Sequence, residues 1–213
     1  MKFKEWKPLY QEIIDYLNIN QKKDKKARDL LQQKITPINL KELKNKINNK
    51  ILVYGNSPNL KEEIRANEPN ITKISADSAT KHLLENNIIP NIIVTDLDGD
   101  IDSIKEAKNK KATIIVHSHG DNIQEIKNNI QALNPVIGTT QTKPIKNIYN
   151  FGGFTDGDRS VFLAQHFGVK EVELIGFNYE KAKGTKLKKL KIAKKLINYL
   201  KNNKEITINH RHQ

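Results

Sequence analysis

The sequence predicts an α/β fold: a doubly wound, mostly parallel sheet with helices on both faces, preceded by an N-terminal helical extension. Two patterns in the 213 residues predict it. Between residues 51 and 175, short apolar runs of strand length alternate with helix-like segments, which is typical of parallel sheets with right-handed crossovers. Before residue 49, apolar residues instead recur every three or four positions, as on one face of a helix.

Residues 1–48 form the expected helical region. The apolar side chains of residues 3–17 fall at helical spacing and form one stripe. Two further helices are expected over residues 24–34 and around residues 40–47, and they are separated by Pro37, which cannot continue a helix.

An α/β domain is expected over residues 49–180. Its strands are expected at residues 51–54, 71–75, 92–95, 113–117, 135–138, 147–151 and 171–175. Helices are expected after the second, fourth and sixth of these strands. The last of them ends near Phe167, with Gly168 as its expected C-cap.

The remaining residues, 181–213, are expected to form a basic helix and a tail packed on the α/β domain. Over residues 185–202, one helix face is apolar and the opposite face is nearly all lysine. We expect the lysine face to be solvated and the final residues to be poorly ordered, as chain ends usually are.

Charge is distributed unevenly along the chain, whose net charge is +13. Residues 1–50 carry +7 and residues 181–213 carry +10, whereas the acidic middle carries −4. A protein that mainly grips a nucleic-acid backbone would place Lys and Arg in its central module. The acidic middle instead favours metal ions, and the basic ends are read as solvated helices or as a rim that attracts phosphates.

Several classes of site and location are excluded by composition. The chain has no cysteine, so it forms no disulfide, thiolate zinc site or cysteine nucleophile. No apolar run approaches the ~20 residues that cross a bilayer, and residues 1–7 lack the apolar stretch of a signal peptide. We therefore expect a cytoplasmic protein with no membrane partner.

Carboxylates follow the predicted strands at their carboxyl ends, where open parallel sheets bind ligands. They are Asp77, Asp96, Asp98, Asp100, Asp121, Asp156 and Asp158. Crowded carboxylates repel one another, and a divalent cation relieves the repulsion. Oxygen ligands without thiolates suit Mg²⁺. Asp96 and Asp98 lie two residues apart, which places them on one side of an extended chain and within reach of one ion.

Structural interpretations of the same residues remain open. Asp77 and Asp102 are good N-cap residues, and one of Asp156 and Asp158 is expected to cap the helix that they open. Arg159 is suited either to a phosphate or to an internal ion pair with one of those two aspartates.

Two other motifs also have alternative interpretations. His117, His119 and Asp121 are a conceivable zinc site, although hydrogen bonding or substrate contact fits them better. Residues 55–58 suit an ordinary turn or a loop that approaches phosphate. The chain has no Walker motif and no Gly-x-Gly-x-x-Gly, so a nucleotide would be held differently.

Taken together, the loop motifs resemble those of the archaeal 6-hydroxymethyl-7,8-dihydropterin pyrophosphokinase family, which is related to thiamine pyrophosphokinases. The resemblance covers roughly residues 50–180 and rests on the segments 55–58, 95–99, 117–122, 138–141, 152–159 and 176–179. It implies Mg²⁺-dependent transfer of diphosphate from ATP to the hydroxymethyl pterin, giving AMP and the pterin diphosphate. It also implies a place in the synthesis of tetrahydromethanopterin, the archaeal folate analogue.

The resemblance also implies roles for individual residues. Catalysis is assigned to Asp96, Asp98, Asp121 and Arg159. Metal binding is assigned to Asp96, Asp98, Asp121 and Asp156. Contacts to ATP or the pterin are assigned to Gly55, Asn56, Ser57, Asp77, His117, His119, Asn122, Thr139, Thr140, Gln141, Phe154, Thr155 and Asp158. One of the carboxylates is a candidate to take the substrate proton instead of binding metal.

Three other functions remain open from the sequence. They are a thiamine pyrophosphokinase-like enzyme acting on another hydroxyl acceptor, a glycosyl-transfer relative that binds a nucleotide sugar, and a basic module that binds nucleic acid through its ends. The acidic strand ends disfavour the last, so the expected partners are ATP and a pterin, without nucleic acid. The oligomeric state is left open, with a homo-oligomer among the options.

Overall fold

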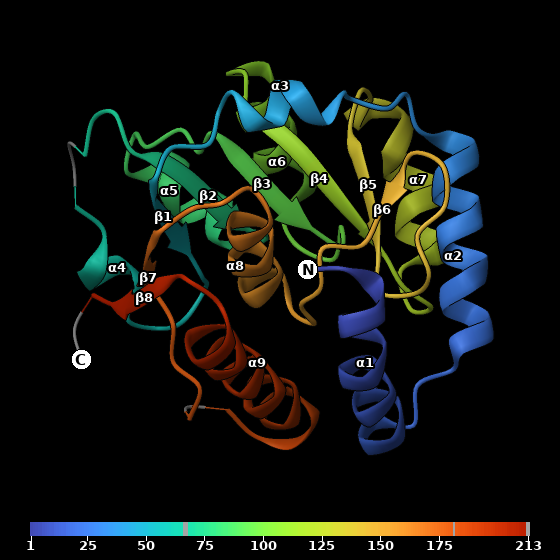
Figure 1. The fold of residues 1–213 in the computed structure, drawn as a ribbon. Helices are drawn as coiled ribbons and strands as arrows, with labels where there is room; N and C mark the ends of the chain where they lie inside the picture. The colour runs from blue at the N-terminus through green and yellow to red at the C-terminus, as the bar shows by residue number, and fades with distance from the viewer. Residues whose placement is uncertain (66–67, 181, 212–213) are drawn as a thin grey trace.

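A single parallel sheet organises the computed structural model, which describes residues 1–65, 68–180 and 182–211. Within these residues, eight strands lie in the order β6-β5-β4-β3-β2-β1-β7-β8 (Figure 1). Their bounds are β1 Lys50–Tyr54, β2 Thr72–Ala76, β3 Ile92–Thr95, β4 Thr113–Ser118, β5 Ile137–Thr140, β6 Ile148–Tyr149, β7 Glu171–Ile175 and β8 Thr207–His210. The predicted doubly wound sheet is confirmed.

Helices cover both faces of this sheet (Figure 1). Their bounds are α1 Phe3–Leu17, α2 Gln21–Lys34, α3 Leu40–Lys44, α4 Leu60–Glu63, α5 Ala79–Glu85, α6 Ile101–Asn109, α7 Ile123–Leu133, α8 Asp156–His166 and α9 Gly184–Asn203. The chain winds outward from β1 to β6 and then returns to place β7 on the other side of β1. Because crossovers are right-handed, this reversal puts α8 and α9 on the face opposite α4–α7.

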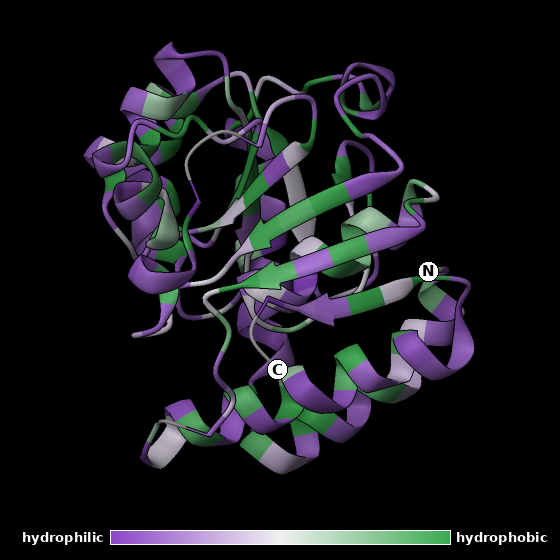
Figure 2. Cartoon of the chain, turned by 90° about the vertical axis from the view of Figure 1, so that its left-hand side faces the viewer, coloured by the Kyte–Doolittle hydropathy of each residue, from purple (hydrophilic) through white to green (hydrophobic). Residues whose placement is uncertain are grey.

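Alternating side chains of the strands build the core on each face. Ile51 and Val53 of β1 join the apolar cluster of α1, α8 and α9. Leu52 and Tyr54 point the other way and join the cluster of α4 and α5. Apolar residues accordingly gather in the strands between the two helical layers (Figure 2). Among the described helices, none is both long and apolar enough to span a membrane.

The N-terminal helices α1 and α2 pack near the half of the sheet that contains β4, β5 and β6. Trp6 of α1 is fully buried and donates its indole N–H to the main-chain carbonyl of Gln141, at 2.9 Å. The side chain of Asn20 caps α2 by accepting from the N–H groups of Lys22 and Lys23. Helix α2 then packs along α7 and β5, with Leu31 in the core. Both helices therefore reach the strand ends.

Several element boundaries differ from those expected. The fifth strand begins at Ile137 instead of residue 135, because Val136 is used in a separate parallel bridge to Pro37. Helix α4 was not predicted, and helix α6 was expected only through the N-cap considered at Asp102. Helix α6 is capped by Asp100, whose carboxylate accepts from the N–H of Ser103 at 2.9 Å, so the cap expected at Asp102 was assigned two residues too late.

The expectation of a poorly ordered tail is wrong for residues 207–211. Strand β8 pairs in parallel with β7 at the sheet edge. Beyond it, the buried Arg211 guanidinium forms ion pairs with Glu68 and Glu173, the latter on β7. These ion pairs hold the last strand against the loop that precedes β2. They could not be predicted from the sequence, because the paired residues are far apart along the chain.

We expect Arg211→Met to lower the free energy of unfolding by about 2 kcal/mol, because it leaves two carboxylates without their partner. The cost is below that of a fully buried pair, since both glutamates keep some contact with solvent. Urea denaturation measures it. Lys170→Ala, which removes an exposed pair with Glu205, is the matched control and should leave the midpoint unchanged. Equal midpoints for the two variants would contradict the anchoring role of Arg211.

Candidate functional site

A cavity of about 590 Å³ opens at the carboxyl ends of the strands. The loop after β1 (residues 55–58) and the loop after β7 (residues 176–179) both line it, at the point where the winding of the sheet reverses. The start of α8 forms its floor. The turn from α1 to α2 and the first turns of α9 complete its walls. Open α/β sheets bind their ligands at such a switch point.

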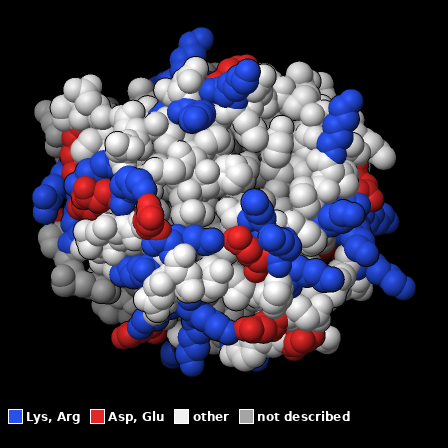
Figure 3. All heavy atoms as spheres, viewed as in Figure 1, with Lys and Arg blue, Asp and Glu red and all other residues white. Residues whose placement is uncertain are grey.

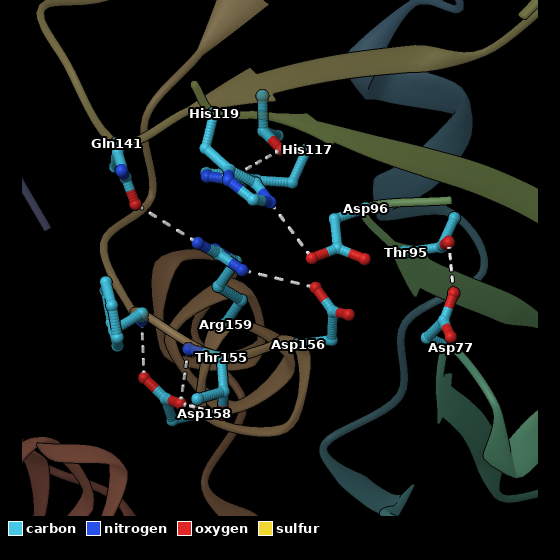
Figure 4. Close-up of polar contacts among 12 residues, drawn as sticks. Asp77, Thr95, Asp96, His117, His119, Gln141, Thr155, Asp156, Asp158 and Arg159 are labelled. Carbon is cyan, nitrogen blue, oxygen red and sulfur yellow. Dashed lines mark hydrogen bonds and ion pairs between the residues drawn. The ribbon is translucent and has the colours of Figure 1, made fainter. Parts of the chain in front are cut away.

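Three carboxylates converge in this cavity. Asp77, Asp96 and Asp156 each present an oxygen, and these atoms lie within 4.8 Å of one another. They come from the ends of β2 and β3 and from the first residue of α8 (Figure 4). We call these three residues the acidic trio. Oxygen ligands in this arrangement suit a hard divalent cation such as Mg²⁺.

Asp77 is held by backbone geometry as well as by hydrogen bonds. Its φ of 39° lies in the left-handed region, which non-glycine residues rarely adopt. Its carboxylate accepts from the hydroxyls of Thr95 and Ser78. A side chain at Gly99 would collide with the same carboxylate, its Cβ lying 1.9 Å from Oδ2. Asp77 is therefore not the N-cap that its position after a strand suggested.

The segment Asp96–Leu97–Asp98 is a turn instead of a continuation of β3. Leu97 has a φ of 69° and its side chain is buried. The two carboxylates therefore do not share a face by strand alternation, as the sequence suggested. Asp96 joins the acidic trio, whereas Asp98 lies beside it in the cavity. Burial and the neighbouring charge of Asp96 raise the pKa of Asp98 to about 7.

Asp156 opens α8 and faces Arg159 one turn later. The Arg159 guanidinium is 7% exposed and lies 3.2 Å from the Asp156 carboxylate. Its other terminal nitrogen donates to Oε1 of Gln141 at 3.3 Å, so the arginine bridges the two residues (Figure 4). The internal ion pair considered from the sequence is present, and the guanidinium still lines the cavity.

The three carboxylates of the acidic trio have pKa values that are shifted in different directions. Burial opposes the ionisation of Asp96, but the hydrogen bond from His119 at 3.0 Å and its charge hold the pKa of Asp96 below its usual range. Burial, and then the charge of Asp96, raises the pKa of Asp156 well above its usual value. Burial also raises that of Asp77. Full ionisation of the trio is costly without a cation, and this is the character of a metal site.

Most residues assigned from the sequence do line the cavity. In addition to the acidic trio, Asp98 and Arg159, they are Gly55, Asn56, Ser57, His119, Asp121, Gln141, Phe154 and Thr155. Asp121, expected to bind metal, is exposed at the rim and lies outside the acidic trio.

Five assigned residues lie behind the cavity wall and support it. Asn122 donates to the main-chain carbonyls of Asp96 and His117, so it fixes the strand ends. Asp158 accepts from the N–H groups of Phe154 and Thr155 and completes a capping box, as expected for one of the two aspartates. The other three are the buried His117, Thr139 and Thr140. In the described part of the chain, the converging ligand atoms include no histidine, unlike the zinc alternative.

Sequence reasoning missed several residues of the cavity wall. Asp24 and Lys23 lie on α2, and Lys186 and Lys189 lie on α9. The lysine face of that last helix was expected to be solvated, with a rim that attracts phosphates as the alternative. The lysines stay exposed at the rim, and Lys189 is close enough to Asp98 to favour its ionised form. Basic side chains on this side of the molecule are interspersed with acidic ones (Figure 3). No sequence pattern identifies these residues. They are recognised only from the folded structure, in which α2 and α9 lie beside the carboxyl ends of the strands.

Asp156→Asn should raise the melting temperature of the metal-free protein. The unfolded chain releases the Asp156 proton at about pH 4, whereas the folded protein, in which the pKa of Asp156 is raised, keeps it. The free energy of unfolding therefore falls as pH rises above that value. The asparagine removes this loss. Thermal unfolding in EDTA should show a larger gain at neutral than at acidic pH.

A matched control for this measurement is Asp121→Asn at the exposed rim, which should cause no shift. Millimolar MgCl₂ should then stabilise the wild type more than the Asp156 variant. If the melting temperature of Asp156→Asn in EDTA is equal to or lower than that of the wild type, the prediction that crowded carboxylates destabilise the fold is wrong.

Comparisons with known proteins show the family to which this chain belongs. A family model described as "6-hydroxymethylpterin diphosphokinase MptE-like" matches residues 25–184. A 6-hydroxymethyl-7,8-dihydropterin pyrophosphokinase of Pyrococcus furiosus is 41% identical over an alignment that covers 95% of this chain and 96% of that protein. The protein of the same name from Methanocaldococcus jannaschii is 38% identical, with 97% and 98% covered. The chain therefore belongs to the 6-hydroxymethylpterin diphosphokinase MptE-like family.

Proposed function

We propose that this protein transfers diphosphate from ATP to the hydroxyl group of 6-hydroxymethyl-7,8-dihydropterin. The observation that carries the proposal is the acidic trio, which faces a cavity at the switch point of a sheet. The names of the relatives supply the acceptor and the reaction. The pterin diphosphate would then serve tetrahydromethanopterin synthesis in an archaeal cell.

In this reaction the pterin hydroxyl oxygen forms a bond to the β-phosphorus of ATP. The bond from that phosphorus to the oxygen bridging the α-phosphate breaks, and AMP leaves with that oxygen. The hydroxyl proton must pass to a base. Asp98 is the candidate, because it lines the cavity beside the acidic trio without belonging to it. Positioning and charge neutralisation account for most of the catalysis of phosphoryl transfer.

Asp77, Asp96 and Asp156 are the residues that would hold Mg²⁺. They fit it because all three ligands are carboxylates whose charges need compensation. When bound, the ion neutralises charge on phosphate oxygens. Around this group, His119 keeps Asp96 ionised and Arg159 balances Asp156. These two contacts keep the trio ready to bind a cation.

Cationic and apolar side chains complete the proposed substrate site. Lys23, Lys186 and Lys189 line the cavity and are exposed at its rim, where they suit the negative charge of a triphosphate. Both substrates also carry a flat heterocycle. Phe154, Phe177, Tyr179 and Leu190 line the cavity and provide apolar surface for such rings.

Product analysis tests the proposed function. With Mg²⁺, ATP and the dihydropterin, chromatography should show AMP and the pterin diphosphate. Asp96→Asn should lower kcat by at least ~100-fold, because it removes a ligand. The matched control, Asp100→Asn, removes an ion pair with Lys81 but keeps an oxygen that can cap α6, so it should keep kcat within about threefold. ADP as the sole nucleotide product would refute the reaction.

Lys189→Ala should raise KM for ATP about fivefold with little change in kcat, which corresponds to roughly 1 kcal/mol of screened attraction. Lys188→Ala is the matched control. Its ammonium group lies 5.8 Å from the centre of the Tyr16 ring and does not line the cavity. High salt should narrow the difference between the two variants. Equal KM values at low salt would exclude Lys189 from the phosphate site.

A further inference from the structure

Asp24 is a buried carboxylate at the start of α2 that the proposed reaction does not use. It is 1% exposed, and three donors from three separate segments point at its two oxygens. Oδ2 accepts from the Tyr10 hydroxyl and from Nε2 of Gln141, the latter at 2.7 Å. Oδ1 accepts from the N–H of Gly120, also at 2.7 Å. Such a network is expensive to bury, and it fixes the groups that surround it.

The first consequence concerns the orientation of the Gln141 amide. Because Asp24 only accepts hydrogen bonds, the NH₂ group of Gln141 must face it. The amide oxygen then points the other way and accepts from Arg159 at 3.3 Å. Arg159 in turn contacts Asp156 of the acidic trio. Asp24 therefore determines which end of Gln141 meets the arginine.

The second consequence concerns the loop after β4. A Cβ on Gly120 would lie 2.6 Å from Cβ of Lys23, so only glycine lets this loop approach α2 so closely. The bond from the Gly120 N–H to Asp24 holds the loop there. The preceding residue, His119, contacts Asp96 at 3.0 Å. One carboxylate on α2 thus holds the supports of two members of the acidic trio.

We propose that Asp24 is a positioning residue for the acidic trio, acting on Asp156 through Gln141 and Arg159 and on Asp96 through Gly120 and His119. It contributes no metal ligand, since its oxygens are taken by three donors. The inference deepens the proposed function and rests on it for the activity measurement. Supports of this kind are worth about 10- to 100-fold in metal affinity or activity.

Asp24→Asn tests the proposal because it changes hydrogen-bond polarity with little change in shape. The oxygen of the introduced amide must serve the Gly120 N–H, so the NH₂ group of that amide faces Gln141. Gln141 then turns its own NH₂ group toward Arg159, where two donors meet. We expect at least a tenfold loss in kcat for AMP formation. We expect a similar loss in Mn²⁺ affinity, measured by electron paramagnetic resonance of the free ion.

The double variant Asp24→Asn with Gln141→Glu supplies the decisive comparison. It restores an acceptor for both the introduced amide and Arg159, and it leaves the summed charge of the pair unchanged. Both kcat and Mn²⁺ affinity should return to within about threefold of the wild type. A double variant as impaired as Asp24→Asn would overturn the proposal, as would a folded Asp24→Asn with wild-type values.

Tyr10→Phe is the matched control, because it removes a buried bond to Asp24 but leaves Gln141 and Gly120 in place. It should lower the melting temperature and keep kcat and Mn²⁺ affinity within about twofold. Equal losses for Tyr10→Phe and Asp24→Asn would make Asp24 merely structural. If Asp24→Asn does not fold, Gln141→Met breaks the same link and should show the tenfold losses, and wild-type values there would refute the proposal.

The two measurements separate the two proposals. If the wild type forms no AMP with the pterin, the proposed function fails, and Mn²⁺ affinity alone decides the role of Asp24. If the wild type is active but the Asp24 variants follow none of the expected pattern, the positioning role alone fails.

Discussion

Repulsion among three converging carboxylates is the constraint on which the rest of this structure depends. Asp77, Asp96 and Asp156 have oxygens within 4.8 Å of one another, in surroundings that penalise charge. The protein tolerates this because each carboxylate has a dedicated partner. Thr95 serves Asp77, His119 serves Asp96 and Arg159 serves Asp156. Each of these partners lowers the local cost of placing the three carboxylates together.

The sheet topology makes this arrangement possible. Parallel strands end at one edge, so residues from β2, β3 and α8 meet there although they are far apart in sequence. The winding reverses at β1, and the two loops that follow β1 and β7 there, at Gly55 and Gly176, contact each other and both line the cavity. Helices α1, α2 and α9 then add walls that the sheet itself does not provide. The sheet thus places the acids, and the added helices determine how they are surrounded.

How much could be predicted depended on the range of the interaction. The strands and their terminal aspartates were predictable because apolar runs and the residues after them are local patterns, as at Ile92–Thr95. The place of Asp98, beside Asp96 but outside the acidic trio, was not predictable, since it follows from the left-handed turn at Leu97. The role of Asp24 was not predicted, because its hydrogen-bond partners Gly120 and Gln141 lie about a hundred residues away in the sequence.

Contributions to the cavity wall begin at Leu17 and extend to Leu190. During synthesis on the ribosome, the strands from β1 to β5 emerge before α8, and well before α9. Asp77 and Asp96 are therefore made before Asp156, Arg159 and the lysines of α9 exist. A nascent chain at that stage lacks the helices α8 and α9, which cover one face of the sheet and complete the site. The cavity should consequently be completed late in biogenesis, once nearly the whole polypeptide has left the exit tunnel.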